Sequence, residues 1–108
     1  MYIYNITFVI DPAREDEFLT WMRGEAIAAL FNENSLARNP RLQTVVETGG
    51  EKPLPEHGLS IALQAEFDTE ASAHEWDSTT LPPVLGDFTQ KFGPHCAFFA
   101  TLLTVIPL

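Results

Sequence analysis

The order of hydrophobic periods along the chain is the feature that most constrains its fold. Four segments alternate apolar and other residues with the period of two that is typical of β-strands, and they span 2–10, 41–49, 59–67 and 95–106. Segments with apolar residues at the three- and four-residue spacing of helices follow the first and the third strand. The order β-α-β-β-α-β predicts an α+β, ferredoxin-like fold, with a four-stranded antiparallel sheet and helices on one face.

The first strand is followed by a clear helix start signal. One face of the strand carries Tyr2, Tyr4, Ile6, Phe8 and Ile10, and the other carries Ile3, Asn5, Thr7 and Val9. Asp11 and Pro12 then fit the N-cap and first position of a helix, and acidic residues follow where the helix dipole favours negative charge. We expect this helix to end at about Phe31.

The stretch over 75–88, EWDSTTLPPVLGDF, places two adjacent prolines in an otherwise helical pattern. A proline in a helix interior costs about 3 kcal/mol, whereas at the first turn its missing N–H needs no partner. We therefore predict one short helix over 68–78 and a second over 82–92. Thr80 or Leu81 is the expected N-cap of the second helix.

Two polar segments are predicted connections. Residues 32–40, NENSLARNP, are rich in turn-forming residues and are expected to form a loop. Residues 50–58, GEKPLPEHG, hold two prolines and two glycines, so we expect a long, exposed and mobile hairpin connection.

The last strand is apolar on both faces. Ala97, Phe99, Leu103 and Val105 alternate with Cys96, Phe98, Ala100, Leu102 and Ile106. Such a strand is typical of the centre of a sheet, or of a sheet that packs against a second layer. Because two helices cover only one sheet face, an exposed apolar second face would be a liability for a monomer. We predict a homodimer formed sheet to sheet.

Composition excludes several classes of partner. A length of 108 residues, with 45% apolar and 19% charged residues, predicts one globular domain over 1–108. Six basic and fifteen acidic residues give a net charge of −9, which disfavours binding to nucleic acid or to an anionic membrane surface. No apolar run approaches the roughly 20 residues that span a bilayer.

The single cysteine, Cys96, cannot form an internal disulfide, and the chain lacks a cysteine spacing typical of metal sites. The N-terminal segment alternates and has no basic start, so we do not expect a signal peptide. These features favour a cytoplasmic protein that holds neither metal nor cofactor.

Four segments together resemble a family of short bacterial proteins known only as a domain of unknown function. They are YIYNITFVID at 2–11, TWMRGEAI at 20–27, GLSIALQ at 58–64 and KFGPHCAFFATLLTVI at 91–106. That family is similar to the dimeric α+β barrel group, which also includes cofactor-free monooxygenases, lactone isomerases and haem-binding enzymes. The resemblance implies that fold.

The family positions that match this chain form a packing signature: Asn5, Trp21, Met22, Gln64, Phe92, Gly93 and Thr101. The family pattern often has a histidine where this chain has Ala26, and an arginine where it has Ala100. We therefore carry no active-site residue over from the resemblance, and the fold alone implies no chemistry.

Five residues are candidates for a ligand pocket between the sheet and the helices: Asn5, Trp21, Gln64, His74 and Trp76. The two amides are strand residues, and a buried amide must bond to protein, water or a ligand. The tryptophans suit either a core or a pocket wall, since each has a large apolar area and one N–H donor. His74 is a candidate general base, but the ordinary interpretation is an exposed helix residue.

Three functions remain open. The first is a homodimer that binds a small, mainly apolar molecule between sheet and helices without catalysis. The second is a cofactor-free isomerase or monooxygenase, with Asn5, His74 and Trp76 near the substrate. The third is a structural dimerisation or partner-binding domain with a filled core.

Overall fold

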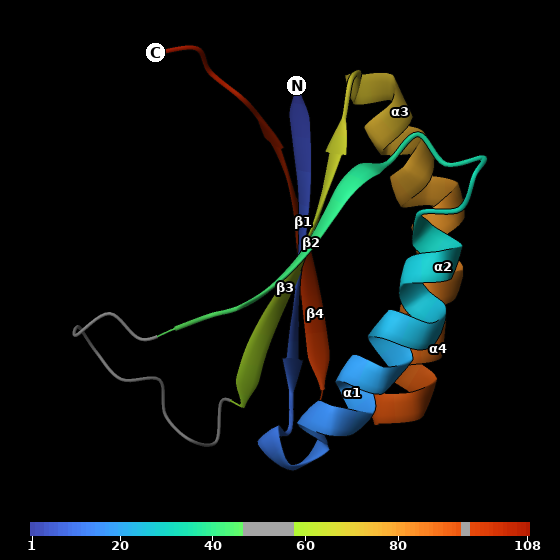
Figure 1. Cartoon of the computed structure of the whole chain (residues 1–108), viewed down its shortest axis with the longest axis vertical. Helices are drawn as coiled ribbons and strands as arrows, with labels where there is room; N and C mark the ends of the chain where they lie inside the picture. Colours follow the sequence, from blue (N-terminus) through green and yellow to red (C-terminus); the bar gives the residue numbers. More distant parts are fainter. Residues whose placement is uncertain (47–57, 94–95) are drawn as a thin grey trace.

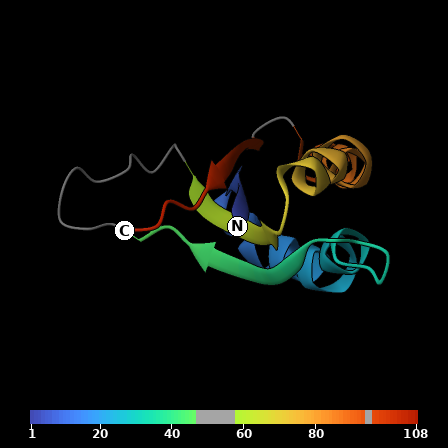
Figure 2. The ribbon, with the colours of Figure 1, turned by 90° about the horizontal axis from the view of Figure 1, so that it is seen from above.

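The computed structural model describes residues 1–46, 58–93 and 96–108. The strands are β1 (Tyr2–Ile10), β2 (Arg38–Thr44), β3 (Leu59–Phe67) and β4 (Ala97–Thr104), and the helices are α1 (Glu15–Trp21), α2 (Ile27–Leu30), α3 (Glu70–Glu75) and α4 (Leu81–Phe92). The strands form one antiparallel sheet in the order β2-β3-β1-β4. All helices lie on one face of this sheet and leave the other face open (Figures 1 and 2), so the predicted ferredoxin-like α+β fold is confirmed.

The first helical segment begins where the sequence predicts. The Asp11 side chain accepts a hydrogen bond from the Ala13 N–H at 2.9 Å and caps a 3₁₀ turn over Pro12–Arg14, which leads into α1. A π-helical turn, Met22–Ala26, joins α1 to α2, and the segment ends at Leu30. The predicted bounds of this helix are confirmed. The π turn inside it was not predicted.

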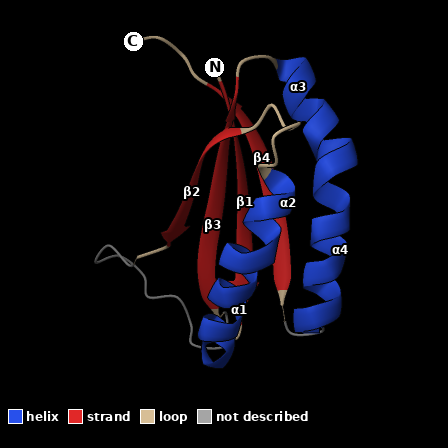
Figure 3. Cartoon of the chain, turned by 45° about the vertical axis from the view of Figure 1, so that its right-hand side comes forward, coloured by secondary structure: helices blue, strands red, loops and turns tan. Residues whose placement is uncertain are grey.

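The second helical segment is continuous from α3 to α4, so the prediction of two separate helices is wrong (Figure 3). A π turn, Trp76–Thr80, connects them, and the Leu81 N–H donates to the Trp76 carbonyl five residues back. Thr80 has helical angles, φ −86° and ψ −41°, and makes no side-chain cap. The wide turn changes the hydrogen-bond register just before Pro82 and Pro83, which occupy the first turn of α4 where proline is tolerated.

The edge strand β2 differs from its predicted bounds, which were 41–49. It begins at Arg38, and its pairing with β3 has an irregularity between Arg38 and Arg41. Asn39 there has a φ of 52°, a left-handed conformation that asparagine tolerates, and proline is acceptable at position 40 because the strand is an edge. Asn39 and Pro40 are typical of turns, so the start of β2 was predicted as part of the loop over 32–40. The expected mobile connection at 50–58 lies, except for Gly58, outside the described residues.

The last strand, β4, is the other edge of the sheet, so the predicted central position is wrong. Its helix-facing side packs partly on the core, because the Phe98 ring lies 6.1 Å from that of Phe88. Its other side remains uncovered in a single chain, with Phe99 59% and Leu103 48% exposed. The alternative prediction, a second layer on this face, stays a prediction.

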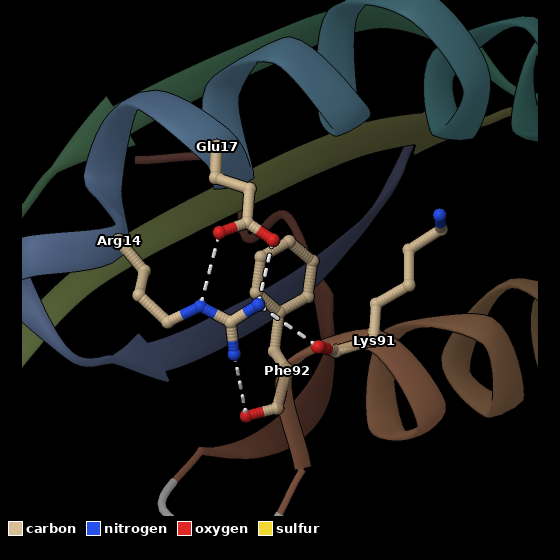
Figure 4. Close-up of polar contacts among 4 residues, drawn as sticks. All are labelled: Arg14, Glu17, Lys91 and Phe92. Atoms are coloured by element: carbon tan, nitrogen blue, oxygen red, sulfur yellow. Dashed lines mark hydrogen bonds and ion pairs between the residues drawn. The ribbon is translucent and has the colours of Figure 1, made fainter.

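Arg14 ties the start of the first helical segment to the end of α4 (Figure 4). Its guanidinium donates to the Glu17 carboxylate at 2.6 Å and to the carbonyls of Lys91 and Phe92 at 3.0 and 3.3 Å. It also lies 4.7 Å from the centre of the Phe92 ring. The last carbonyls of a helix lack intrahelical partners and attract cations, so this one side chain satisfies two of them and fixes the two segments together.

Candidate functional site

A groove of about 380 Å³ lies between the first helical segment and the strands β2 and β3. Small-molecule sites commonly enclose about 300 to 1,000 Å³, so the groove is large enough for a small ligand. Its apolar lining consists of Leu19, Met22, Ile27, Pro40, Leu42, Ile61 and Leu63. The groove therefore lies where the sequence predicts a pocket, although its lining includes none of the five predicted residues.

Two periodicities produce the apolar lining. Leu42 pairs with Leu63 across β2 and β3, and both side chains belong to the helix-facing side of the sheet. On the helical wall, the Ile27 N–H donates to the Met22 carbonyl, so the π turn stacks residues that are five positions apart. Met22 and Ile27 can thus both face the groove, which an α-helical spacing of three or four does not provide.

Among the described residues, the charged ones that line the groove are both arginines. Arg23 comes from the π turn and Arg41 from β2, and both are exposed. A larger hollow of about 560 Å³, between α1 and the end of α4, contains Asp16, Glu17 and Glu25 with Lys91. The groove at β2 is thus distinguished by an apolar wall and a positive rim.

Asn5 and Gln64 do not point into the space between the sheet and the helices, so that prediction of their orientation is wrong. Their neighbours Tyr4, Ile6 and Leu63 belong to the buried core, and alternation along a strand places the two amides on the open face. They lie opposite each other in the β1–β3 register. Their role in binding a ligand stays a prediction.

Trp21 and Trp76 lie in the core, where they are only 6% and 3% exposed. The Trp21 indole N–H donates to the Asp87 carboxylate at 2.8 Å, and that of Trp76 donates to the Leu30 carbonyl at 2.9 Å. Each tryptophan thus bonds to the other helical segment and has a satisfied donor. This geometry accounts for both residues through packing, and ligand contact by either stays a prediction.

His74 is exposed on α3, and its Nε2 lies 3.8 Å from the Glu70 carboxylate one helical turn away. The structure does not bring it together with Asn5, which is on the open sheet face, or with the buried Trp76. His57 and His95 lie outside the described residues. Within 1–46, 58–93 and 96–108, no group of three or more His, Cys, Asp or Glu residues could hold a metal ion.

A polar pair that was not among the predicted site residues joins β1 to the second π turn. The Tyr4 hydroxyl donates to the Asp77 carboxylate, while the Tyr4 ring packs edge-on against Trp76 at 5.2 Å. Burial, together with the hydrogen bond and the negative charge of Asp77, raises the pKa of Tyr4 well above its usual range. No sequence signal links these partners, which are 73 positions apart.

Tyr4 should make the stability of the protein fall at high pH. An unfolded tyrosine has a pKa of about 10, and the folded pKa is higher. The contribution of Tyr4 is therefore complete below a pH of about 10 and is lost as the pH rises from there through the folded pKa. We expect Tyr4→Phe to lose less stability over this range than the wild type, in urea unfolding followed by circular dichroism. Tyr2→Phe is the control, and equal losses in all three proteins would contradict the assignment.

Comparisons with known proteins agree with this fold. A family model described as a domain of unknown function, DUF4286, matches residues 1–106. No curated protein has significant sequence similarity to the chain. In the described part of the chain, no helix is long and apolar enough to cross a membrane.

Solved structures share the fold at low sequence identity. An ethyl tert-butyl ether D (EthD) family protein from Bacillus halodurans is 15% identical, with a TM-score of 0.65 over 98% of this chain and 100% of that one. A monooxygenase from the gene ActVA-Orf6 of Streptomyces coelicolor, in complex with nanaomycin D, is 13% identical, with a TM-score of 0.62 over 99% and 88%.

A third structure is a mutant of MhuD with two manganese protoporphyrin IX molecules bound per active site. It is 14% identical, with a TM-score of 0.52 over 98% of this chain and 97% of that one. At such identities the likeness shows the fold alone, which is that of the dimeric α+β barrel group, as predicted.

Proposed function

The chain belongs to the family defined by the domain of unknown function DUF4286, and on this premise we propose that it is a homodimer that binds a small, mainly apolar molecule between its sheet and its helices. The groove at β2 is the observation that carries this proposal, because it has an apolar wall and a volume of about 380 Å³. Two solved structures of the same fold hold organic ligands, which supports the binding of a small molecule.

The open face of the sheet supports the homodimer. Phe99 and Leu103 lie on this face in register with Thr7 and Ile3 of β1, and they are largely exposed in a single chain. Exposed apolar surface of this kind marks an interaction site. A second copy is the simplest partner, since a two-fold axis buries the same patch on both chains.

A polar row crosses the same face and suits a self-complementary interface. Arg41 is in register with Gln64, Gln64 with Asn5, and Asn5 with Thr101, so the row spans all four strands. Amide side chains both donate and accept hydrogen bonds. When a dimer covers the row, Asn5 and Gln64 can pair with the same groups of the partner, which gives them a role at the interface instead of in a pocket.

A cofactor-free isomerase or monooxygenase is the second candidate, favoured by the monooxygenase among the structures of this fold. The residues expected to serve that chemistry lie apart: Asn5 is on the open face, His74 is exposed on α3, and Trp76 is in the core. We therefore place binding before catalysis.

Thermal unfolding tests the ligand. We expect at least one member of a screen of quinones, lactones, aromatic acids and haem to raise the melting temperature. A ligand at a hundred times its dissociation constant stabilises by about 2.7 kcal/mol, which corresponds to roughly 10 °C or more for a chain of this size.

The variant Leu42→Trp fills the groove and should abolish the shift. Leu36→Trp is the matched control, because Leu36 is exposed in the segment between α2 and β2 and does not line the groove. A shift that persists in Leu42→Trp would place the ligand elsewhere. No shift with any compound would favour the structural function with a filled core.

A further inference from the structure

We propose that the ligand of the groove is a monocarboxylate with an aliphatic body, an inference that rests on the proposed function. The apolar wall supplies the first reason. Its side chains are aliphatic or thioether groups, from Leu19 and Met22 on the helical side to Ile61 and Leu63 on the sheet. Aromatic side chains gather instead in the core around Phe8 and do not line this groove. An alkyl chain is the body that such a wall covers best.

The charges at the rim supply the second reason. Arg23 and Arg41 both line the groove, and within residues 1–46, 58–93 and 96–108 no acidic residue does. The chain holds only six basic residues against fifteen acidic ones, so two cations at one apolar groove run against its overall charge. A local positive potential in a negative protein favours an anionic ligand head.

The hydrogen-bonding state of the arginines supplies the third reason. Arg14 forms an ion pair with Glu17, and Arg38 forms one with Asp68. Within the described ranges, neither Arg23 nor Arg41 forms an ion pair with an acidic side chain. A guanidinium group without such a partner can bind a carboxylate through two parallel hydrogen bonds.

The placement of Arg23 makes it the main head-group residue. It follows Met22 in the π turn, and Met22 is fully buried while Arg23 is exposed, so the apolar wall and the cation meet within two consecutive residues. Arg41 is in register with Gln64 of the open face and lies at the free edge of β2, where it is also among the residues that line the groove. A monocarboxylate fits better than a phosphate head, which carries nearly two charges to be desolvated.

Isothermal titration with three eight-carbon probes tests the inference. Octanoate, 1-octanol and octylammonium share one tail and differ in the charge of the head at pH near 7. We expect octanoate to bind most tightly and octylammonium least, although the net charge of −9 attracts the cation. Arg23→Gln should weaken octanoate roughly 5-fold, as for a partly solvated ion pair, and leave 1-octanol unchanged. Arg41→Gln should have a smaller effect of the same kind.

Arg38→Gln is the matched control, because it makes the same change in net charge outside the groove lining. Equal binding of all three probes, or tightest binding of octylammonium, would overturn the carboxylate and leave the proposed function standing. An equal loss of octanoate binding in Arg38→Gln and Arg23→Gln would also overturn it. Failure of all three probes to bind would overturn the aliphatic carboxylate, whereas the proposed function fails only if the thermal screen of quinones, lactones, aromatic acids and haem also gives no shift.

Discussion

At micromolar concentration the wild-type chain is expected to elute with twice the 12.1 kDa mass of one chain, and the variant Phe99→Glu with the mass of one. Phe99 is 59% exposed on the open face and would lie inside the proposed sheet-to-sheet interface. A carboxylate there would be buried without a partner, which costs several kcal/mol, and the two-fold axis doubles the cost. The dissociation constant should therefore rise at least about 1,000-fold, or roughly 4 kcal/mol. Size-exclusion chromatography with light scattering measures both masses.

Leu36→Glu makes the same change of charge outside the sheet, at a residue that is similarly exposed. It should leave the dimer intact. Higher salt should strengthen the wild-type dimer, because each copy carries a net charge of −9 and salt screens their repulsion. A wild-type chain with the mass of one copy, or equal dissociation of the two variants, would contradict the proposed interface.

Much of the fold could be predicted because it depends on local patterns. The period of two in β1 and β3 gave both the strands and the separation of their faces, and the Asp11–Pro12 signal gave the start of the first helical segment. Edges were harder to predict. A strand that is apolar on both faces suggests burial, yet β4 lies at the edge and is uncovered in one chain. The pattern could not distinguish a sheet centre from a surface that a partner would cover.

The residues that line the groove could not be predicted, because the lining depends on backbone features without a clear sequence signal. The π turn at Met22–Ala26 brings Met22 and Ile27 to one wall, whereas helical periodicity assumes a spacing of three or four. The second π turn, Trp76–Thr80, was not predicted either, because Pro82 and Pro83 after it suggested the start of a separate helix. Contacts between segments that are distant in the sequence, such as the hydrogen bond from the Trp76 indole to the Leu30 carbonyl, could not be predicted either. The candidate residues were therefore chosen by residue type, and they lie on the open face, in the core and on the helix surface.

Gly58→Ala is expected to lower the free energy of unfolding by about 3 kcal/mol or more. Gly58 precedes β3 with a φ of 79°, a left-handed conformation that costs an alanine roughly 1 to 2 kcal/mol. An added Cβ would also lie 2.5 Å from the Ile10 carbonyl oxygen, so the paired ends of β1 and β3 would have to move apart. The melting temperature should fall by more than about 10 °C in calorimetry.

Gly86→Ala is the matched control and should change stability in the opposite direction. Gly86 lies within α4, and a Cβ added there would have no heavy atom within 4 Å apart from its chain neighbours and the backbone of its own helix. Replacing a helix-interior glycine by alanine restricts the unfolded chain and stabilises by about 0.5 to 1 kcal/mol. The same methyl group thus tests backbone conformation at one site and chain entropy at the other. If both variants changed stability in the same direction, the left-handed turn before β3 would not be what requires a glycine at position 58.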